Sequence, residues 1–267
     1  DEPVRLRDAT IEDVAFIVAL DESARGRWLV TTVRDDTLWR YEIDGRDAAS
    51  DDHVQVRVIE QAGGRPAGYV ACVLKPDDVA WVESFEIVAE ASWLEIVPGV
   101  LRHLLAVIDV RGDAETRETY AAFDLGPDHP AYRAMPNALH PYHTDDGLYM
   151  RVADLPAFLT RIAPVLEARL AASTAAGHSG ELPINFYRSG VRLTFKDGKL
   201  ASVTSEHMEY SVAASFPDLS FLQLLFGYRS LAELDAWYPD CRIRTNEARV
   251  LLDALFPKQP SFVWPVW

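Results

Sequence analysis

Apolar and polar residues alternate along much of the chain, and the period of that alternation predicts its elements. A period of two, with Val54, Val56 and Val58 on one face, is typical of a half-buried strand. In the first half this period predicts strands at 4–7, 53–61, 66–74, 80–89, 119–125 and 148–152. Residues 62–65, Ala-Gly-Gly-Arg, separate two of these strands and predict a hairpin turn.

Helical spacing, with apolar residues three and four positions apart, occurs between these strands. It predicts one helix that begins after Thr10, a residue able to cap it, and two more at 36–43 and 93–108. The proline-containing stretch 126–147 is expected to be a loop. The first half therefore has an α+β order of strand, helix, helix, hairpin, strand, helix and strand.

A second unit is expected to begin near residue 155. A long apolar stripe predicts a single helix over 155–172, and a loop of small residues follows it. The next patterns are strands at 181–187, 191–195, 200–204 and 210–216 and helices at 218–225, 230–237 and 246–255. The first three of these strands, joined by tight turns, predict an antiparallel meander. We therefore expect two α+β domains, residues 1–154 and 155–267.

The charge is unevenly distributed between the two halves. Of the 267 residues, 1–155 hold 30 acidic and 15 basic side chains, whereas 156–267 hold 11 of each. Such a field repels nucleic acid and anionic membranes and attracts cations, so it fits a polyamine-type substrate as well as a merely soluble acidic surface. We therefore expect neither nucleic acid nor a membrane as a partner.

Other features of the composition indicate a cytoplasmic protein. The chain has no run of eighteen apolar residues and no secretory signal, and its two cysteines, Cys72 and Cys241, are too few for a disulfide scaffold. It begins at Asp1 without an initiator methionine, and we expect it to be a piece of a longer protein.

Two stretches of the second half, together with the order of the elements, resemble known families. Residues 180–188, Gly-Glu-Leu-Pro-Ile-Asn-Phe-Tyr-Arg, and 221–228, Phe-Leu-Gln-Leu-Leu-Phe-Gly-Tyr, resemble the sterol carrier protein type of domain. The element order of the first half resembles the Gcn5-related N-acetyltransferase (GNAT) fold. In tandem, ending in the aromatic Trp267, they resemble the enhanced-intracellular-survival group of acetyltransferases. That group combines a catalytic domain, a second acetyltransferase-like domain without cofactor, and a terminal sterol-carrier-like domain.

The resemblance also indicates where acetyl-CoA would bind. In this fold the pyrophosphate lies on backbone N–H groups between the fourth strand and the next helix, in a Gln/Arg-x-x-Gly-x-Gly/Ala loop. The corresponding residues 88–99 carry Glu90, Trp93 and Glu95, and their single glycine, Gly99, comes too late. Each carboxylate near a pyrophosphate would cost on the order of 1 kcal/mol or more. We therefore expect no cofactor in this chain, and acetyl-CoA on a catalytic domain that precedes it.

The resemblance assigns chemistry to few residues. In the related group the carboxylate of an aromatic last residue is the general base, which here is Trp267, in an apolar surround that includes Trp264. Tyr132 stands near the place of the family's general-acid tyrosine, and Trp264, Tyr187 and Tyr228 are candidates to bind a cationic amine. The alternative to a catalytic carboxylate is a tail that only packs on a domain surface. The alternative to a catalytic Tyr132 is a structural tyrosine.

For two further groups of side chains we favour a structural role over a functional one. His129 and the stretch 140–146 hold ligand-type side chains without the spacing of a zinc site, so a solvent-exposed loop is expected. The aromatic residues of the second half could line a lipid tunnel, but a filled core is expected. They are Phe186, Tyr187, Phe195, Tyr210, Phe216, Phe221 and Phe226.

Three functions are compatible with these observations. The favoured one is the part of an amine N-acetyltransferase that supplies scaffold, acceptor-site walls and the terminal base. A carrier of lipid or another hydrophobic ligand and a structural module that forms homo-oligomers are the alternatives. An apolar cavity within 156–267 would separate the carrier from the other two.

Overall fold

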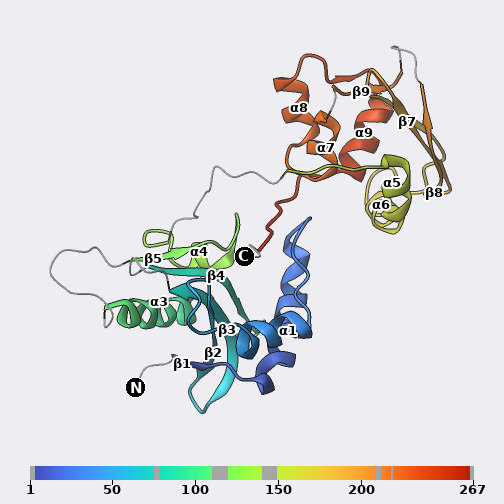
Figure 1. The fold of residues 1–267 in the computed structure, drawn as a ribbon. Helices are drawn as coiled ribbons and strands as arrows, with labels where there is room; N and C mark the ends of the chain where they lie inside the picture. Colours follow the sequence, from blue (N-terminus) through green and yellow to red (C-terminus); the bar gives the residue numbers. More distant parts are fainter. Residues whose placement is uncertain are drawn as a thin grey trace. The chain divides into compact units, whose positions relative to one another are not determined.

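The computed structural model describes residues 4–74, 79–109, 120–139, 149–207, 212–217 and 219–264. The chain divides into one unit of Asp1–Asp145 with Ser261–Trp267 and a second of Asp146–Pro260. Each unit combines helices with a five-stranded sheet, so the chain is α+β, as the sequence predicted (Figure 1). The sequence pattern placed the last residues with the second half, whereas Ser261–Trp267 group with the first unit. A linear pattern does not show which unit such a segment contacts.

The first unit is built on a sheet in the order β1-β2-β3-β4-β5. Its strands are β1 (Val4–Asp8), β2 (Val54–Gln61), β3 (Arg65–Leu74), β4 (Val79–Ile87) and β5 (Tyr120–Phe123). The first four pair antiparallel in chain order, whereas β5 is parallel to β4. Each strand pairs with its neighbour in the sequence, as the predicted hairpin requires.

Helices cover both faces of this sheet. They are α1 (Val14–Ala24), α2 (Asp36–Arg40), which continues as a π-helical turn (Tyr41–Gly45), α3 (Trp93–Asp109) and α4 (Pro130–Ala134). Successive side chains of a strand point to opposite faces. Tyr69 and Ala71 therefore pack with α1 and α2, whereas Val70 and Cys72 pack with α3.

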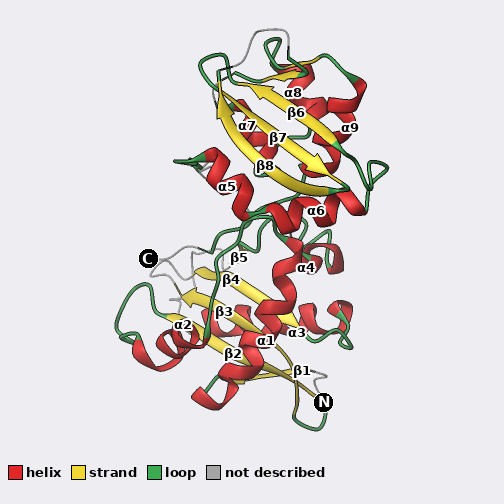
Figure 2. Cartoon of the chain, turned by 90° about the vertical axis from the view of Figure 1, so that its right-hand side faces the viewer, coloured by secondary structure: helices red, strands yellow, loops and turns green. Residues whose placement is uncertain are grey.

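The second unit has a sheet in the order β10-β9-β6-β7-β8. Its strands are β6 (Gly180–Asn185), β7 (Gly190–Lys196), β8 (Lys199–Glu206), β9 (Ala214–Ser215) and β10 (Arg242–Ile243). Its helices are α5 (Leu155–Arg161), α6 (Ala163–Ala171), α7 (Ser220–Leu225), α8 (Leu231–Trp237) and α9 (Asn246–Leu255). Figure 2 shows β6, β7 and β8 side by side with α7, α8 and α9 behind them. The predicted meander is therefore present.

The single helix expected over 155–172 is wrong, because the structure has two. The chain leaves helical geometry at Ile162, with φ −91° and ψ 8°, between α5 and α6. Pro164 is the second residue of α6. Proline has no N–H to donate and its ring crowds the carbonyl four residues earlier, so the helix is interrupted there.

Three other boundaries also differ from the sequence pattern. No strand forms over 149–152, the described part of the strand expected at 148–152. Of the described part of 210–216, only Ala214–Ser215 is strand. The loop expected over 126–147 contains α4, which begins with Pro130 after the capping residue His129. Proline in the first turn loses no helical hydrogen bond, so a short helix is compatible with this proline-containing stretch.

Aromatic side chains of the second unit pack against one another. Phe221 contacts Phe186, Phe216 and Phe256, with ring centroids 5.3, 5.4 and 5.5 Å apart. Phe216, Phe221 and Phe256 are buried. These contacts are those of a packed core, which is the arrangement expected of this domain.

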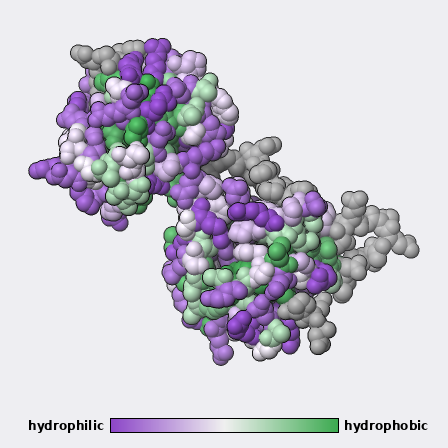
Figure 3. All heavy atoms as spheres, turned by 180° about the vertical axis from the view of Figure 1, so that it is seen from behind, coloured by the Kyte–Doolittle hydropathy of each residue, from purple (hydrophilic) through white to green (hydrophobic). Residues whose placement is uncertain are grey.

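The surface carries the composition of an ordinary globular protein. Figure 3 shows one face on which hydrophilic residues predominate and hydrophobic ones are interspersed. Within the described residues, no helix has the length and apolar character needed to cross a membrane.

Candidate functional site

The first unit has an opening where two parallel strands part. Pairing between β4 and β5 runs from Val79↔Tyr120 to Val82↔Phe123, and the N–H of Asp124 still donates to the carbonyl of Val82 at 2.9 Å. Beyond that point β4 continues to Ile87, whereas β5 ends at Phe123. A pocket lies beside this part of β4.

Side chains from several parts of the first unit surround the gap. The pocket has a volume of about 400 Å³ when its opening to solvent is included, but its interior has room for about one water molecule. Its walls include Glu83–Glu86 of β4, Asp21 of α1, His129, and Phe262 and Trp264 from the end of the chain. Most of the gap is therefore filled by the protein itself.

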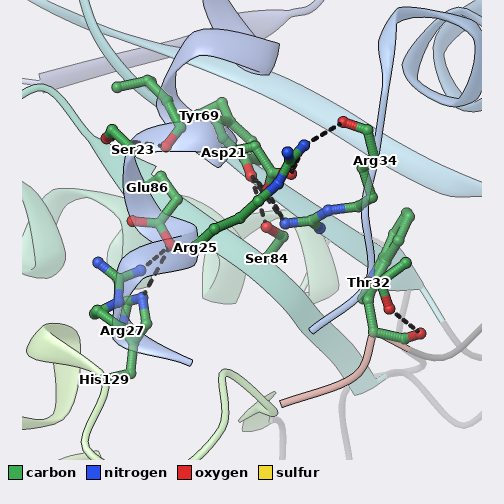
Figure 4. Close-up of polar contacts among 12 residues, drawn as sticks. Asp21, Ser23, Arg25, Arg27, Thr32, Arg34, Tyr69, Ser84, Glu86 and His129 are labelled. Carbon is green, nitrogen blue, oxygen red and sulfur yellow. Dashed lines mark hydrogen bonds and ion pairs between the residues drawn. The ribbon is translucent and has the colours of Figure 1, made fainter. Parts of the chain in front are cut away.

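A buried ion pair lies at the centre of this region (Figure 4). The Arg34 guanidinium donates to the Asp21 carboxylate, and the two residues are 8% and 3% exposed. The Tyr69 hydroxyl lies 2.8 Å from Ser84 Oγ, 3.3 Å from Asp21 Oδ1 and 3.4 Å from Arg34 Nη2. Burial raises the pKa of Asp21, and the neighbouring guanidinium of Arg34 opposes that rise. These residues tie α1, the α1–α2 segment and two strands together.

A second charged group lies beside the first. Glu86 of β4 accepts from Arg27, and His129 Nε2 is 3.7 Å from the same carboxylate oxygen (Figure 4). The His129 Nδ1 atom accepts from the N–H of Ala131 at 3.2 Å, which assigns the ring proton to Nε2. Burial lowers the pKa of His129 although Glu86 opposes that shift, which favours the neutral ring. At 3.7 Å from Glu86, Nε2 is too far to donate a hydrogen bond to it.

The C-terminal segment, Ser261–Trp264, completes the site. The N–H of Phe262 donates to the carbonyl of Val30 at 3.0 Å, and Thr32 Oγ1 donates to the carbonyl of Trp264 at 3.2 Å. The Trp264 ring stacks on Trp39, with centroids 5.7 Å apart. The Arg34 guanidinium lies 4.7 Å from the Trp264 ring and 4.9 Å from the Trp39 ring. The buried cation therefore anchors the end of the chain by cation–π contacts.

Gly126 permits this docking, and its replacement provides a test. A Cβ atom there would lie 2.7 Å from the Phe262 ring, and φ is +76°. We expect Gly126→Ala to lower the free energy of unfolding by at least about 1–2 kcal/mol, the cost of a left-handed alanine. Amide hydrogen exchange at Phe262 should also become faster, because the C-terminal segment is displaced.

The matched control is Gly26→Ala. Nothing lies within 4 Å of a Cβ atom at Gly26 and its φ is not positive, so this variant should be close to neutral. Unchanged stability and exchange in Gly126→Ala would contradict the docked position of Phe262.

The turn between β4 and α3 holds a packed tryptophan and two exposed carboxylates. Helix α3 begins at Trp93, whose ring packs on Phe85 and His129 with centroids 5.0 and 5.2 Å apart. Glu90 and Glu95 are exposed in the same turn. Gly99 lies further along α3, where a Cβ atom would be 2.9 Å from Val4, so it allows the helix to pack on β1.

Of the candidate site residues predicted from the sequence, Tyr132 and Trp264 are described in the first unit. Tyr132 is buried, and its hydroxyl donates to the carbonyl of Phe123 at 2.8 Å and accepts from the N–H of Leu125 at 3.1 Å. Burial raises the pKa of Tyr132 to about 12. Trp264 is buried in the cluster described above, and Trp267 lies outside the described residues. Tyr132 therefore holds the turn after β5.

The other two candidates lie in the second unit. The Tyr187 hydroxyl donates to the carbonyl of Asp240 at 2.6 Å. Tyr228 is 63% exposed, and the guanidinium of Arg229 lies 4.5 Å from its ring. The two tyrosines therefore contact different residues in these interactions.

His129 has surroundings that differ from those expected. His129 was expected in an exposed loop, but it is 2% exposed. It caps α4 and packs against Trp93, which explains its burial. Residues 140–146 lie outside the described residues. Within the part of the chain that the structure describes, no group of three histidine, cysteine or acidic side chains could hold a metal ion.

Sequence reasoning missed the charged residues that form the site. A signal was present, because Asp21 follows the buried Ile17 by four positions on one helix face and Glu86 lies between Phe85 and Ile87 in β4. A charge at an apolar position is buried only when it is paired. The partners, Arg34 and Arg27, come from a segment without periodicity.

Comparison with known proteins identifies the fold. No family model matches the chain, and no curated protein matches it. A GCN5-related N-acetyltransferase structure from Kribbella flavida matches 99% of this chain and 60% of its own, with 18% identity and a TM-score of 0.54. A probable N-acyltransferase from Enterococcus faecalis V583 matches 99% and 62%, with 12% identity and a TM-score of 0.59. The chain spans about three fifths of the length of these structures and has the fold of GCN5-related N-acetyltransferases.

Proposed function

We propose that this chain is the scaffold part of an acetyl-CoA-dependent amine N-acetyltransferase of the cytoplasm, and that another domain binds the cofactor. The filled gap between β4 and β5 carries this proposal. His129 and Phe262 line this gap, Trp93 packs on the His129 ring, and the interior that remains has room for about one water molecule.

The turn at the start of α3 supports the same conclusion. A pyrophosphate needs unobstructed backbone N–H groups and a positive potential. In this turn the first residue of the helix is a tryptophan packed inward, and Glu90 and Glu95 add two exposed negative charges. The chain therefore contributes structure and acceptor-site walls, while the reaction takes place on the accompanying domain.

The arrangement of the enhanced-intracellular-survival group is part of this proposal. Residues 1–154 correspond to its cofactor-free acetyltransferase-like domain and 155–267 to its sterol-carrier-like domain. The contacts among Phe186, Phe216, Phe221 and Phe256 favour a structural second domain over a lipid carrier. The excess of carboxylates in the first half favours a cationic amine as the acceptor.

The candidate tyrosines and tryptophans have separate roles in this proposal. Trp264 anchors the C-terminal segment, so that the terminal carboxylate of Trp267 is available as a general base for the catalytic domain. Tyr132 has a structural role, because both hydrogen bonds of its hydroxyl go to the backbone. Tyr187 and Tyr228 remain candidates to contact the amine.

Calorimetric titration with acetyl-CoA tests the proposal. We expect no binding heat from this chain up to about 1 mM cofactor. A dissociation constant of about 1 mM corresponds to a binding free energy of about 4 kcal/mol. A Glu90→Gln/Glu95→Gln variant separates the effect of the two negative charges from that of the packed Trp93. It removes the charges but not the packed Trp93, and it should also fail to bind. A dissociation constant in the micromolar range for the unmodified chain would contradict the proposal.

A further inference from the structure

The C-terminal segment lies in the first unit in the manner of a bound peptide. Phe262 forms an isolated parallel bridge with Thr31, and its N–H donates to the carbonyl of Val30 at 3.0 Å. The N–H of Val30 in turn donates to Ser261 Oγ at 3.2 Å. An extended peptide that pairs with an exposed backbone edge is a recurring mode of peptide recognition. The backbone contacts of the segment are of this kind.

Side chains of the segment alternate between inward and outward positions. Phe262 is half-buried, Val263 is 37% exposed and Trp264 is 4% exposed. Successive side chains of an extended chain point to opposite sides. Phe262 and Trp264 therefore face the protein, whereas Val263 faces solvent.

The first of two subsites holds the Phe262 ring. Its centroid lies 5.7 Å from that of the Trp28 ring. A Cβ atom at Gly126 would lie 2.7 Å from the Phe262 ring, so the glycine leaves the space that the ring occupies. This subsite therefore accepts an aromatic ring between a tryptophan and a bare stretch of backbone.

The second subsite holds the Trp264 ring. This ring stacks on Trp39 and lies 4.7 Å from the Arg34 guanidinium. Attraction between a guanidinium and an aromatic face is strongest for indole. Thr32 Oγ1 donates to the carbonyl of Trp264, so the backbone is held at this position too (Figure 4). The second subsite therefore favours tryptophan.

The occupant of the two subsites comes from a distant part of the chain. Val30 and Ser261 are 231 positions apart. The contacts are hydrogen bonds, ring contacts and cation–π contacts, all of which a separate peptide of the same sequence can make. Covalent attachment adds only a high effective concentration.

We propose that residues 28–34, Trp39 and Gly126 form a peptide-binding groove that recognises an extended Phe-x-Trp sequence. The C-terminal segment occupies the groove within the chain, and a Phe-x-Trp segment of a protein partner takes its place. The partner is recognised by two aromatic side chains two positions apart and by its backbone. This proposal does not depend on acetyl transfer.

A peptide with the sequence of residues 260–264, Pro-Ser-Phe-Val-Trp, acetylated and amidated at its ends, provides the first test. The full chain carrying Trp264→Ala has a weakened segment of its own and should bind this peptide with a dissociation constant below about 1 mM. Fluorescence anisotropy of the labelled peptide measures the binding. Absence of saturable binding by the folded variant overturns the proposal.

Two altered peptides identify the subsites. Alanine in place of the tryptophan should weaken binding at least about tenfold, because it empties the second subsite. Alanine in place of the valine, which corresponds to the exposed Val263, should change the dissociation constant by less than about twofold. Equal affinities of the two altered peptides overturn the proposal, because binding would then not use the inward side chains.

The unmodified chain provides an independent test that needs no variant. The amide of Phe262 exchanges with solvent hydrogen when the segment leaves the groove. A peptide that binds the open groove increases the open population by a factor of one plus the ratio of peptide concentration to dissociation constant. At about 1 mM peptide this exchange should therefore become at least about twofold faster, and the peptide without tryptophan should have little effect. An unchanged exchange rate overturns the proposal.

Discussion

Replacing Asp21 with alanine is expected to lower the free energy of unfolding of the first unit by about 3–5 kcal/mol, because the Arg34 guanidinium would stay buried without its carboxylate. Arg34 is 8% exposed, and Asp21 is its ion-pair partner in the site. For a unit of this size the midpoint of thermal unfolding should fall by about 10 °C. Thermal and denaturant unfolding followed by circular dichroism measure the effect.

Two controls distinguish the buried charge from other causes. Asp21→Leu/Arg34→Met removes both charges and should be far less destabilising than Asp21→Ala, since a buried ion pair is replaceable by apolar groups of similar size. Asp36→Ala breaks an exposed ion pair with Arg40 and should cost less than about 1 kcal/mol. If Asp21→Ala were no more destabilising than Asp36→Ala, the ion pair would not stabilise this unit.

On the proposed function, a single glycine added after Trp267 is expected to reduce acetyltransferase turnover by about 10²–10⁴-fold, the usual contribution of a general base. The added residue moves the terminal carboxylate by about 3–4 Å. Binding of acetyl-CoA should be unchanged, because the cofactor site is proposed to lie on another domain. Steady-state rates at saturating amine, measured across a pH series, provide the result.

The position of Trp264 makes this experiment specific. Its ring and carbonyl are held by Trp39, Arg34 and Thr32, so the extension leaves the anchor in place and changes only the residues after it. A rate within about twofold of the unmodified enzyme would show that the terminal carboxylate is not the base. Trp264 would then anchor a tail without a catalytic role.

Local sequence patterns predicted most of the elements. Valines at alternate positions predicted β2, and the helix expected at 246–255 is α9 with the same bounds. Such elements depend on side chains that are close in sequence, so their periods survive in any compact fold. The wrong helix over 155–172 had a local cause too, because Pro164 acts against an apolar stripe that otherwise continues.

The turn before α3 differs from a phosphate-binding loop already in its sequence. Glu90, Trp93, Glu95 and a late Gly99 are local facts, and they indicate a turn unsuited to a pyrophosphate without reference to distant residues. The structure adds that Trp93 packs inward on Phe85 and His129. The reason for the late glycine is tertiary, since Gly99 allows α3 to approach β1.

The α+β class and the hairpins could be predicted from the amino-acid sequence, because each depends on neighbouring residues. Which charges are buried and where the segment Ser261–Trp264 lies became known only from the folded structure. Asp21 meets Arg34 across 13 positions, and Val30 meets Ser261 across 231. Such partners have no fixed spacing, and a charge is tolerated inside only where the folded chain brings its counter-charge within contact. The candidate site therefore exists only in the folded unit.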